Sequence, residues 1–241
     1  MYIDQEKCVA CKSCIPYCPM KAIEDNKEKG IVEINYDECV ECGVCKYSDV
    51  CPTDALTQQE MEYPRILRSQ FSNPLVPHPG TGVPGRGTEE MKTNDVTGRF
   101  KRGMAGVAIE MGRPGTGTRL YDVEKVAMAI AKEEVHFEPY NPVTQLMIDT
   151  KTGKMKDEVL NEKALSAIIE FDIPQSKVVP VLKRLKTVIP EIDTVFSLDL
   201  ACRLDKDGSN PVLKLAKEAG FKVSINGKTN VGLGKPLAKE E

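Results

Sequence analysis

The sequence predicts an α+β protein that consists of a small cysteine-rich module, a Gly/Pro-rich extended arm and an α/β sandwich of the split βαβ type. Three observations support this fold class. Eight of the nine cysteines lie before residue 52, glycine and proline supply 16 of the 55 residues from 64 to 118, and two strand-then-helix patterns follow. A chain of 241 residues has room for two modest domains. We place the boundaries at 1–62, 63–104 and 105–241.

The composition indicates an ordinary globular protein. The formal net charge is −3 and 41% of the residues are apolar, which argues against nucleic acid and anionic membranes as partners. The chain has no apolar run of 18 residues, and its start, "MYIDQEKCVA", lacks the features of a signal peptide. We therefore expect a cytoplasmic protein, in which dense cysteines indicate metal binding rather than disulfides.

The cysteine module contains an internal repeat. "EKCVACKSCI" at 6–15 matches "DECVECGVCK" at 37–46 with an offset of 31. "CPMKAI" then matches "CPTDAL" with an offset of 33, so that five residues, rather than three, separate the last two cysteines of the second half. Between the halves, "KGIVEINYD" at 29–37 predicts a turn and a short strand.

The first half has the spacing C-x2-C-x2-C-x3-C-P, in which three cysteines ligate one cubane cluster and the fourth ligates the other cluster. This rule assigns one cluster to Cys8, Cys11, Cys14 and Cys51, and the second to Cys39, Cys42, Cys45 and Cys18. The alternative is two zinc ions with four thiolates each, although zinc modules favour paired CxxC motifs separated by a spacer.

With these motifs, residues 1 to about 60 resemble a bacterial-type ferredoxin domain that carries two 4Fe-4S clusters, and all eight ligand positions are filled. The resemblance implies single-electron transfer at low potential in reductive, often anaerobic, metabolism. The longer Cys45–Cys51 loop departs from the family's pattern. It would change the surroundings of the first cluster, and so its potential, without removing a ligand.

The remainder predicts a ferredoxin-like sandwich through alternating elements. Strands are expected at 105–112 and 164–174, each followed by a helix, at 118–134 and 176–189. The apolar faces of these helices are Leu120, Val123, Ala127, Ile130 and Ala131 in the first, and Val178, Leu182, Leu185 and Ile189 in the second. Further strands are expected within 135–149 and 193–204, a helix capped by Asn210 and ended at Gly220, and a hairpin turning at Asn226-Gly227.

The arm and its borders hold the candidate anion or partner contacts Arg86, Arg113 and Arg119, in or beside two glycine-rich runs. The alternative is an arm that hugs a partner, with its arginines paired to acidic groups. Other candidates are weaker. His78 is expected to be a loop histidine rather than an acid or base, and Cys202 a small buried hydrophobe. Glu110 and Glu170 occupy equivalent positions in the two strand-helix units and are expected to be strand-edge charges rather than a catalytic pair.

From these features we expect a non-catalytic electron-transfer subunit. It would relay single electrons through two 4Fe-4S clusters to or from a larger catalytic oxidoreductase subunit or a soluble redox partner. The C-terminal part would dock on that partner or form a homo-oligomer. Two alternatives remain open: a self-contained iron-sulfur reductase that holds a substrate or cofactor in the Gly-rich arm, and an iron-sulfur ligand sensor with a regulatory C-terminal domain.

Overall fold

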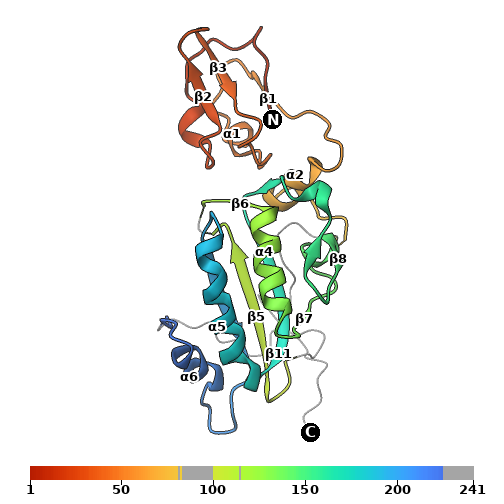
Figure 1. Ribbon diagram of the computed structural model, residues 1–241. Coiled ribbons are helices and arrows are strands. Elements are labelled where there is room, and N and C mark those ends of the chain that lie inside the picture. The colour runs from red at the N-terminus through yellow and green to blue at the C-terminus, as the bar shows by residue number, and fades with distance from the viewer. Residues whose placement is uncertain (81, 83–99, 114, 225–241) are drawn as a thin grey trace.

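The computed structural model describes residues 1–241 except 81, 83–99, 114 and 225–241. The described chain forms two parts with separate hydrophobic cores. Residues 1–57, here called the cysteine module, lie at one end, and the larger part from residue 100 onward is called the body (Figure 1). Helix α2 (Ile66–Ser72) lies between them and contributes Leu67 and Phe71 to the core of the body.

The cysteine module contains little regular structure. β1 (Tyr2–Ile3) pairs with β4 (Leu56–Thr57), and β2 (Ile23–Asn26) pairs with β3 (Ile31–Ile34), both antiparallel. A 3₁₀ turn at Ile15–Tyr17 and the short helix α1 (Val44–Tyr47) complete it. The predicted strand within 29–37 is β3. Cysteine side chains form part of the module's core, so anything bound by the thiols is also part of that core.

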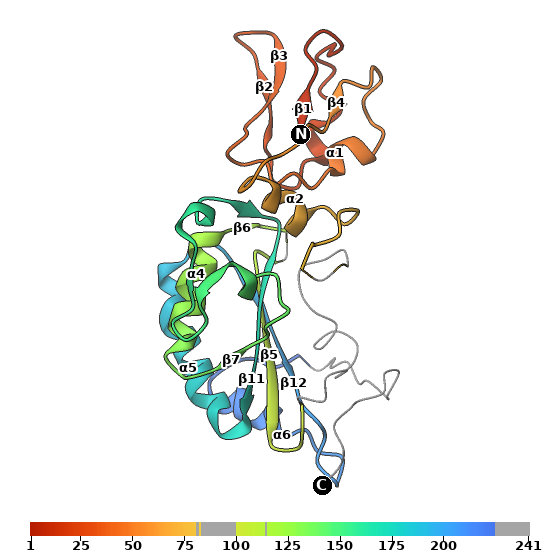
Figure 2. The ribbon, with the colours of Figure 1, turned by 90° about the vertical axis from the view of Figure 1, so that its right-hand side faces the viewer.

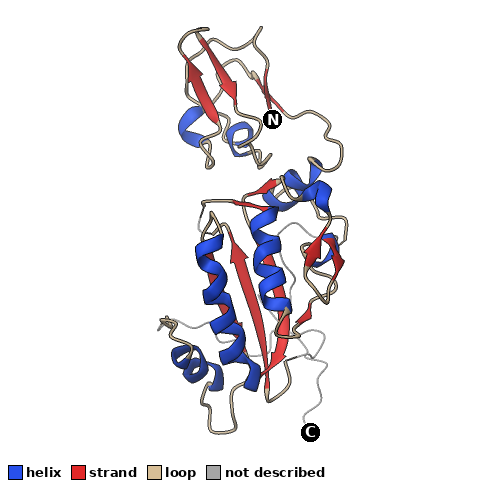
Figure 3. Ribbon diagram, viewed as in Figure 1, coloured by secondary structure: helices blue, strands red, loops and turns tan. Residues whose placement is uncertain are grey.

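The body is built on a four-stranded antiparallel sheet in the order β12-β5-β11-β7. The central strands β5 (Met104–Met111) and β11 (Ala167–Pro174) pair along their whole length, and the outer strands are β12 (Phe196–Ala201) and β7 (His136–Phe137). Helices α4 (Leu120–Ala131) and α5 (Val178–Val188) cover one face of the sheet (Figures 2 and 3). Alternate residues of β5, from Ala105 to Met111, join the helices in the core. The predicted α+β class is confirmed.

Shorter elements surround this sheet. β6 (Thr118–Arg119) pairs with β10 (Lys163–Ala164), and β8 (Met147–Asp149) with β9 (Lys154–Met155). Helix α6 (Pro211–Glu218) packs against α5, and 3₁₀ turns lie at Thr144–Leu146, Asp157–Val159, Gln175–Lys177 and Ile189–Glu191. Within the part of the chain that the structure describes, no helix has the length and apolar character needed to cross a membrane.

The predicted apolar faces of the two helices agree with the structure except at one position, although both helices are shorter than predicted: Thr118 and Arg119 form β6, and α4 ends at Ala131. All five residues of the predicted α4 face are buried, as are Val178, Leu182 and Leu185 of α5. Ile189 is 42% exposed because α5 ends at Val188 and a proline-containing 3₁₀ turn redirects the chain. The Asn210 side chain caps α6 by accepting the Val212 N–H, as expected. The hairpin predicted at Asn226-Gly227 lies outside the described residues.

The prediction for Glu110 and Glu170 is wrong in its placement. Both residues lie in the central strands β5 and β11, not at an edge of the sheet, and both are buried. Burial is tolerated because each carboxylate has partners. Ser197 Oγ donates to Glu110, which also pairs with Arg113, and Asn141 Nδ2 donates to Glu170 at 2.7 Å.

Candidate cluster-binding site

The two halves of the cysteine module repeat one backbone conformation. Left-handed φ angles occur at Ala10 and Glu41, at Lys12 and Gly43, and at Lys21 and Asp54. These pairs have the same offsets, 31, 31 and 33, as the sequence repeat. Such angles are uncommon for residues other than glycine, so their recurrence indicates that each tight cysteine loop is folded in the same way.

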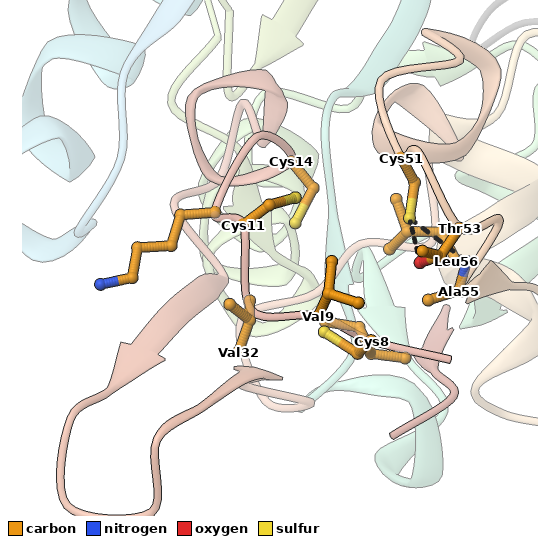
Figure 4. A pocket seen from close by; sticks show the side chains of 11 residues that line it. Cys8, Val9, Cys11, Cys14, Val32, Cys51, Thr53, Ala55 and Leu56 are labelled. Atoms are coloured by element: carbon orange, nitrogen blue, oxygen red, sulfur yellow. Dashed lines mark hydrogen bonds between the residues drawn. The ribbon is translucent and has the colours of Figure 1, made fainter. Parts of the chain in front are cut away.

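A first cavity brings together Cys8, Cys11, Cys14 and Cys51 (Figure 4). Three of these cysteines come from the first repeat and the fourth comes from the second. The cavity encloses about 330 Å³ of empty space, part of it open to solvent, and its walls include Ile3, Val32 and Leu56. Cys11 is exposed, so this cavity lies at a surface of the module.

A second cavity of about 330 Å³ has the reciprocal composition, with Cys39, Cys42 and Cys45 from the second repeat and Cys18 from the first. The three cysteines of the second repeat are buried. Met20 and Val40 are among the apolar residues around them. The duplication has therefore produced two similar four-thiol cavities that differ in their access to water.

The fourth cysteine of each repeat is oriented by the same hydrogen bond. The Ala22 N–H donates to Cys18 Sγ at 3.2 Å, and the Ala55 N–H donates to Cys51 Sγ, also at 3.2 Å. The Thr53 hydroxyl lies 3.7 Å from Cys51 Sγ. Donors aimed at sulfur stabilise a thiolate, which is the form that binds metal.

The thiols of the two cavities differ in acidity because their surroundings differ. Burial raises the pKa of Cys39 and Cys42, and it raises the pKa of Cys45 to about 12. The Ser13 hydroxyl lowers the pKa of Cys11. For Cys51, burial is the largest influence and raises the pKa, but hydrogen bonds from Ala55 and Thr53 together outweigh it and lower the pKa. Metal binding at the second cavity must therefore displace protons from thiols whose pKa is raised by burial.

The cavities suit a group larger than one ion. Each set of four thiols surrounds an open space with apolar walls. Thiolate ligands around such a space match the requirements of an iron-sulfur cubane.

The second cavity lies beside the body, and Arg68 of α2 makes the contact. Its side chain is 5% exposed, and its Nη1 donates to the carbonyl oxygens of Tyr36 at 3.2 Å, Asp37 at 2.7 Å and Cys39 at 2.9 Å. Its Nε pairs with Glu162 of the body. Arg68 thus connects the loop that carries Cys39 to the body.

A second group of ion pairs surrounds this contact. Arg119 donates to Asp37 at 2.6 and 3.0 Å and to Glu38 at 2.9 Å, and Lys163 also pairs with Glu38. The hydrogen bond from Arg119 holds the pKa of Asp37 below its usual range, and the hydrogen bond from Lys163 does the same for Glu38. The acidic residues just before Cys39 are therefore neutralised by cations of the body.

Glu41 is a buried acid within the second cysteine loop, 1% exposed. Arg65 Nε donates to it at 3.1 Å, and the Met1 ammonium pairs with it as well. Glu41, Arg68 and Glu162 could not be identified from the sequence, because no spacing rule connects them. The only available signal was two arginines, Arg65 and Arg68, one helical turn apart directly after the module.

Two of the three predicted anion contacts, Arg113 and Arg119, pair with acidic residues of the chain itself. Arg113 pairs with Glu110 at 2.6 Å and Arg119 pairs with the cysteine module, while Arg86 lies outside the described residues. The first turn of α4 also carries the buried acid Asp122. These contacts agree with the alternative in which arginines pair with acidic groups.

The remaining candidates have structural surroundings. His78 is 5% exposed and accepts the Gly80 N–H at its Nδ1, and burial lowers its pKa. His136, the other histidine of the chain, begins β7, and its Nδ1 lies 3.2 Å from Asp172 Oδ1. Cys202 is half-buried and donates to Asn210 Oδ1. All three lie outside the two cysteine cavities.

Comparison with known proteins identifies the module. The family model of the 4Fe-4S dicluster domain matches residues 7–55. Pyruvate synthase subunit PorD of Methanocaldococcus jannaschii is 40% identical over 60 residues, which are 25% of this chain and 66% of that protein. PorD of Thermotoga maritima is 44% identical over 55 residues, which are 22% of this chain and 52% of that subunit. No solved structure gives a significant match.

The match is more complete for a small carrier. A ferredoxin of Methanothermococcus thermolithotrophicus is 43% identical over 60 residues, which are 24% of this chain and 95% of that protein. The matched segment is thus nearly a whole ferredoxin but two thirds or less of the PorD subunits. The family model and the ferredoxin relative support two 4Fe-4S clusters rather than two zinc ions. Through its N-terminal module, this chain belongs to the ferredoxin family with two 4Fe-4S clusters.

Proposed function

We propose that this chain is an electron-transfer subunit of an oxidoreductase complex and that it relays single electrons between an outside carrier and a larger catalytic partner. One observation carries the proposal: two four-thiol cavities lie in one small module, the first at a surface and the second lined by Cys39, whose carbonyl Arg68 connects to Glu162 of the body. When bound, each cluster takes up and releases one electron at a time.

The chain's own residues hold and enclose the clusters. Cys8, Cys11, Cys14 and Cys51 would ligate the first, and Cys39, Cys42, Cys45 and Cys18 the second. This crossed assignment is supported by the two cavities, each of which takes its fourth cysteine from the other repeat. The amides of Ala22 and Ala55 would stabilise the crossing thiolates, and the apolar walls would exclude water.

The body is proposed as the docking part. Its strand order, β12-β5-β11-β7, is 4-1-3-2 in chain order, which supports the split βαβ arrangement predicted from the sequence. The domain boundaries at 62 and 104 stay predictions, as do a cytoplasmic location and a homo-oligomer. The PorD matches support a partner that is a catalytic oxidoreductase subunit, because those relatives are subunits of pyruvate synthase.

The test is anaerobic purification of the tagged full chain from its own host, with iron and sulfide analysis and mass spectrometry of co-purifying proteins. We expect about eight irons per chain and a larger catalytic subunit in fixed proportion. A Cys11→Ala variant should lose electron exchange with outside carriers, while the matched variant Cys202→Ala should retain it. About eight irons on a chain that binds no partner and turns over a substrate alone would contradict the proposal.

A further inference from the structure

Arg68 brings a positive charge close to the second cluster site. Its Nη1 donates to the carbonyl oxygen of Cys39 at 2.9 Å, so one hydrogen bond separates the guanidinium from the main chain of a proposed ligand. Two further carbonyls, of Tyr36 and Asp37, accept from the same nitrogen. The charge is thereby held at one place relative to the cavity.

The position is shielded from water. The Arg68 side chain is 5% exposed and that of its ion-pair partner Glu162 is 14% exposed. Water and salt therefore screen these two charges less than they screen surface charges. Glu162 pairs with Nε, whereas Nη1 faces the Cys39 loop, so the positive member of the pair is the nearer one to the cavity.

We propose that Arg68 and Glu162 are positioning residues that set the reduction potential of the second cluster in opposite directions. Reduction adds a negative charge to a cluster. A fixed positive charge nearby therefore raises the reduction potential, and a negative charge lowers it. The inference rests on the proposed function, since it takes Cys39 as a ligand of that cluster.

The effect should be confined to one cluster. The first cavity is lined by Cys8, Cys11, Cys14 and Cys51, and neither Arg68 nor Glu162 contributes to its wall. The charged residue that does line it, Lys12, is half-exposed and pairs with Asp25. Solvent therefore screens the charge of Lys12 more strongly than that of the buried Arg68. Arg68 and Glu162 therefore act on the second cluster alone, beside the buried Glu41 and its two cationic partners.

The test is a redox titration of the full chain under anaerobic conditions, followed by electron paramagnetic resonance. Wild type should show two transitions. In Arg68→Gln one transition should move to lower potential, and in Glu162→Gln the same transition should move to higher potential. Arg68→Lys keeps the charge and should stay near wild type. The other transition should be unchanged in all three variants.

The matched control is Arg184→Gln. Arg184 donates from its Nε to Glu133 at 2.9 Å, as Arg68 does to Glu162, but Arg184 is 41% exposed and Glu133 follows the end of α4 that points away from the module. Neither transition should move in this variant. A shift of both transitions together, a shift in one direction for both Gln variants, or no shift in Glu162→Gln would overturn the inference.

Iron and sulfide analysis separates this inference from the proposed function. If Arg68→Gln fails to retain both clusters, Glu162→Gln and Arg68→Lys decide the question, because each keeps the buried cation. A wild-type chain without two clusters would defeat the proposed ligand set. A wild-type chain with two clusters, whose potentials ignore Glu162→Gln, would defeat the charge-pair inference alone.

Discussion

At the scale of single residues, Cys18 and Cys51 join the two halves of the module. Each follows the tight loop of its own repeat yet lines the cavity of the other repeat. Each also accepts an N–H from the residue four positions later. A substitution at either residue should therefore damage the cluster that is distant in sequence.

Cys18→Ala tests this arrangement. The variant should lose the second cluster, because its fourth ligand is gone, and should keep the first, so that iron falls from about eight to about four per chain. Iron analysis and electron paramagnetic resonance give the measurement, with Cys202→Ala as the control that retains both clusters. Intact spectra of both clusters in Cys18→Ala would disprove the crossed ligation.

The Glu38–Lys163 pair is a second test at this scale. Lys163 lowers the pKa of Glu38, so the stability that the pair contributes is fully present above the unfolded value of about 4.3 and is lost as the pH falls through the lower folded value. At pH 7 a double-mutant cycle of Glu38→Gln and Lys163→Met should give a coupling of about 0.5–1 kcal/mol.

That coupling should weaken in concentrated salt, because Glu38 is 36% exposed. Unfolding in urea, monitored through the loss of cluster absorbance, reports on the module directly. The Lys154–Asp157 pair lies within the body and provides a comparison cycle that should leave the module's transition unchanged. A coupling of zero at low salt would show that Glu38 and Lys163 do not hold the module to the body.

At the scale of elements, the body packs against the module at Gly117, which lies between β5 and β6. Gly117 has a left-handed φ, and a Cβ added there would lie 2.5 Å from Met20 Cε, beside the second cavity. Gly112 has φ +84°, and a Cβ there would lie 2.8 Å from the Gly117 carbonyl carbon and 2.9 Å from the Leu165 oxygen. These glycines allow close backbone packing that other residues would prevent.

Gly112→Ala and Gly115→Ala form a matched pair. Gly115 has φ +70° but open space around it, so its substitution should cost only the left-handed conformation, about 1–2 kcal/mol. Gly112→Ala adds a backbone clash and should cost about 2–5 kcal/mol in the free energy of unfolding. Urea unfolding of the body, followed by circular dichroism, measures the difference. Equal losses would show that close packing at Gly112 is unimportant.

Much of the structure at the level of single elements could be predicted from the sequence, because local residue patterns determine it. The cysteine repeat, the apolar faces of α4 and α5 and the cap at Asn210 are all short-range signals. The junction could not be predicted. Arg68 meets Cys39 and Glu162 across 29 and 94 residues, and no periodicity encodes such a contact. Glu110 was misplaced for the same reason: whether a strand is central depends on pairing between distant segments.

At the scale of the whole molecule, the cysteine module and the body differ in how far their folding depends on the clusters. The module's core is small and includes cysteines, whereas the body has a separate core of many aliphatic residues from its sheet and helices. A module of this size without a large core requires metal for stability. Its folding should therefore be conditional on iron, and that of the body should not be.

Iron chelation under reducing conditions should unfold the module and leave the body folded. Hydrogen exchange measured by mass spectrometry should show full exposure of amides in β2 and β3, while those of β5 and β11 stay protected. Restoring iron and sulfide should restore protection in the module. Loss of protection in both parts would mean that the body has no independent stability.

The unequal exposure of the two cavities also affects survival in air. Cys11 is at the surface, while Cys39, Cys42 and Cys45 are buried beside the body. Dioxygen should therefore attack the first cluster before the second. A chain damaged in this way would keep its second cluster and a folded body. In the proposed complex it would still occupy its place on the catalytic partner, but no electrons could reach the second cluster through the first. Brief aeration would then convert the chain into an inhibitor of that complex.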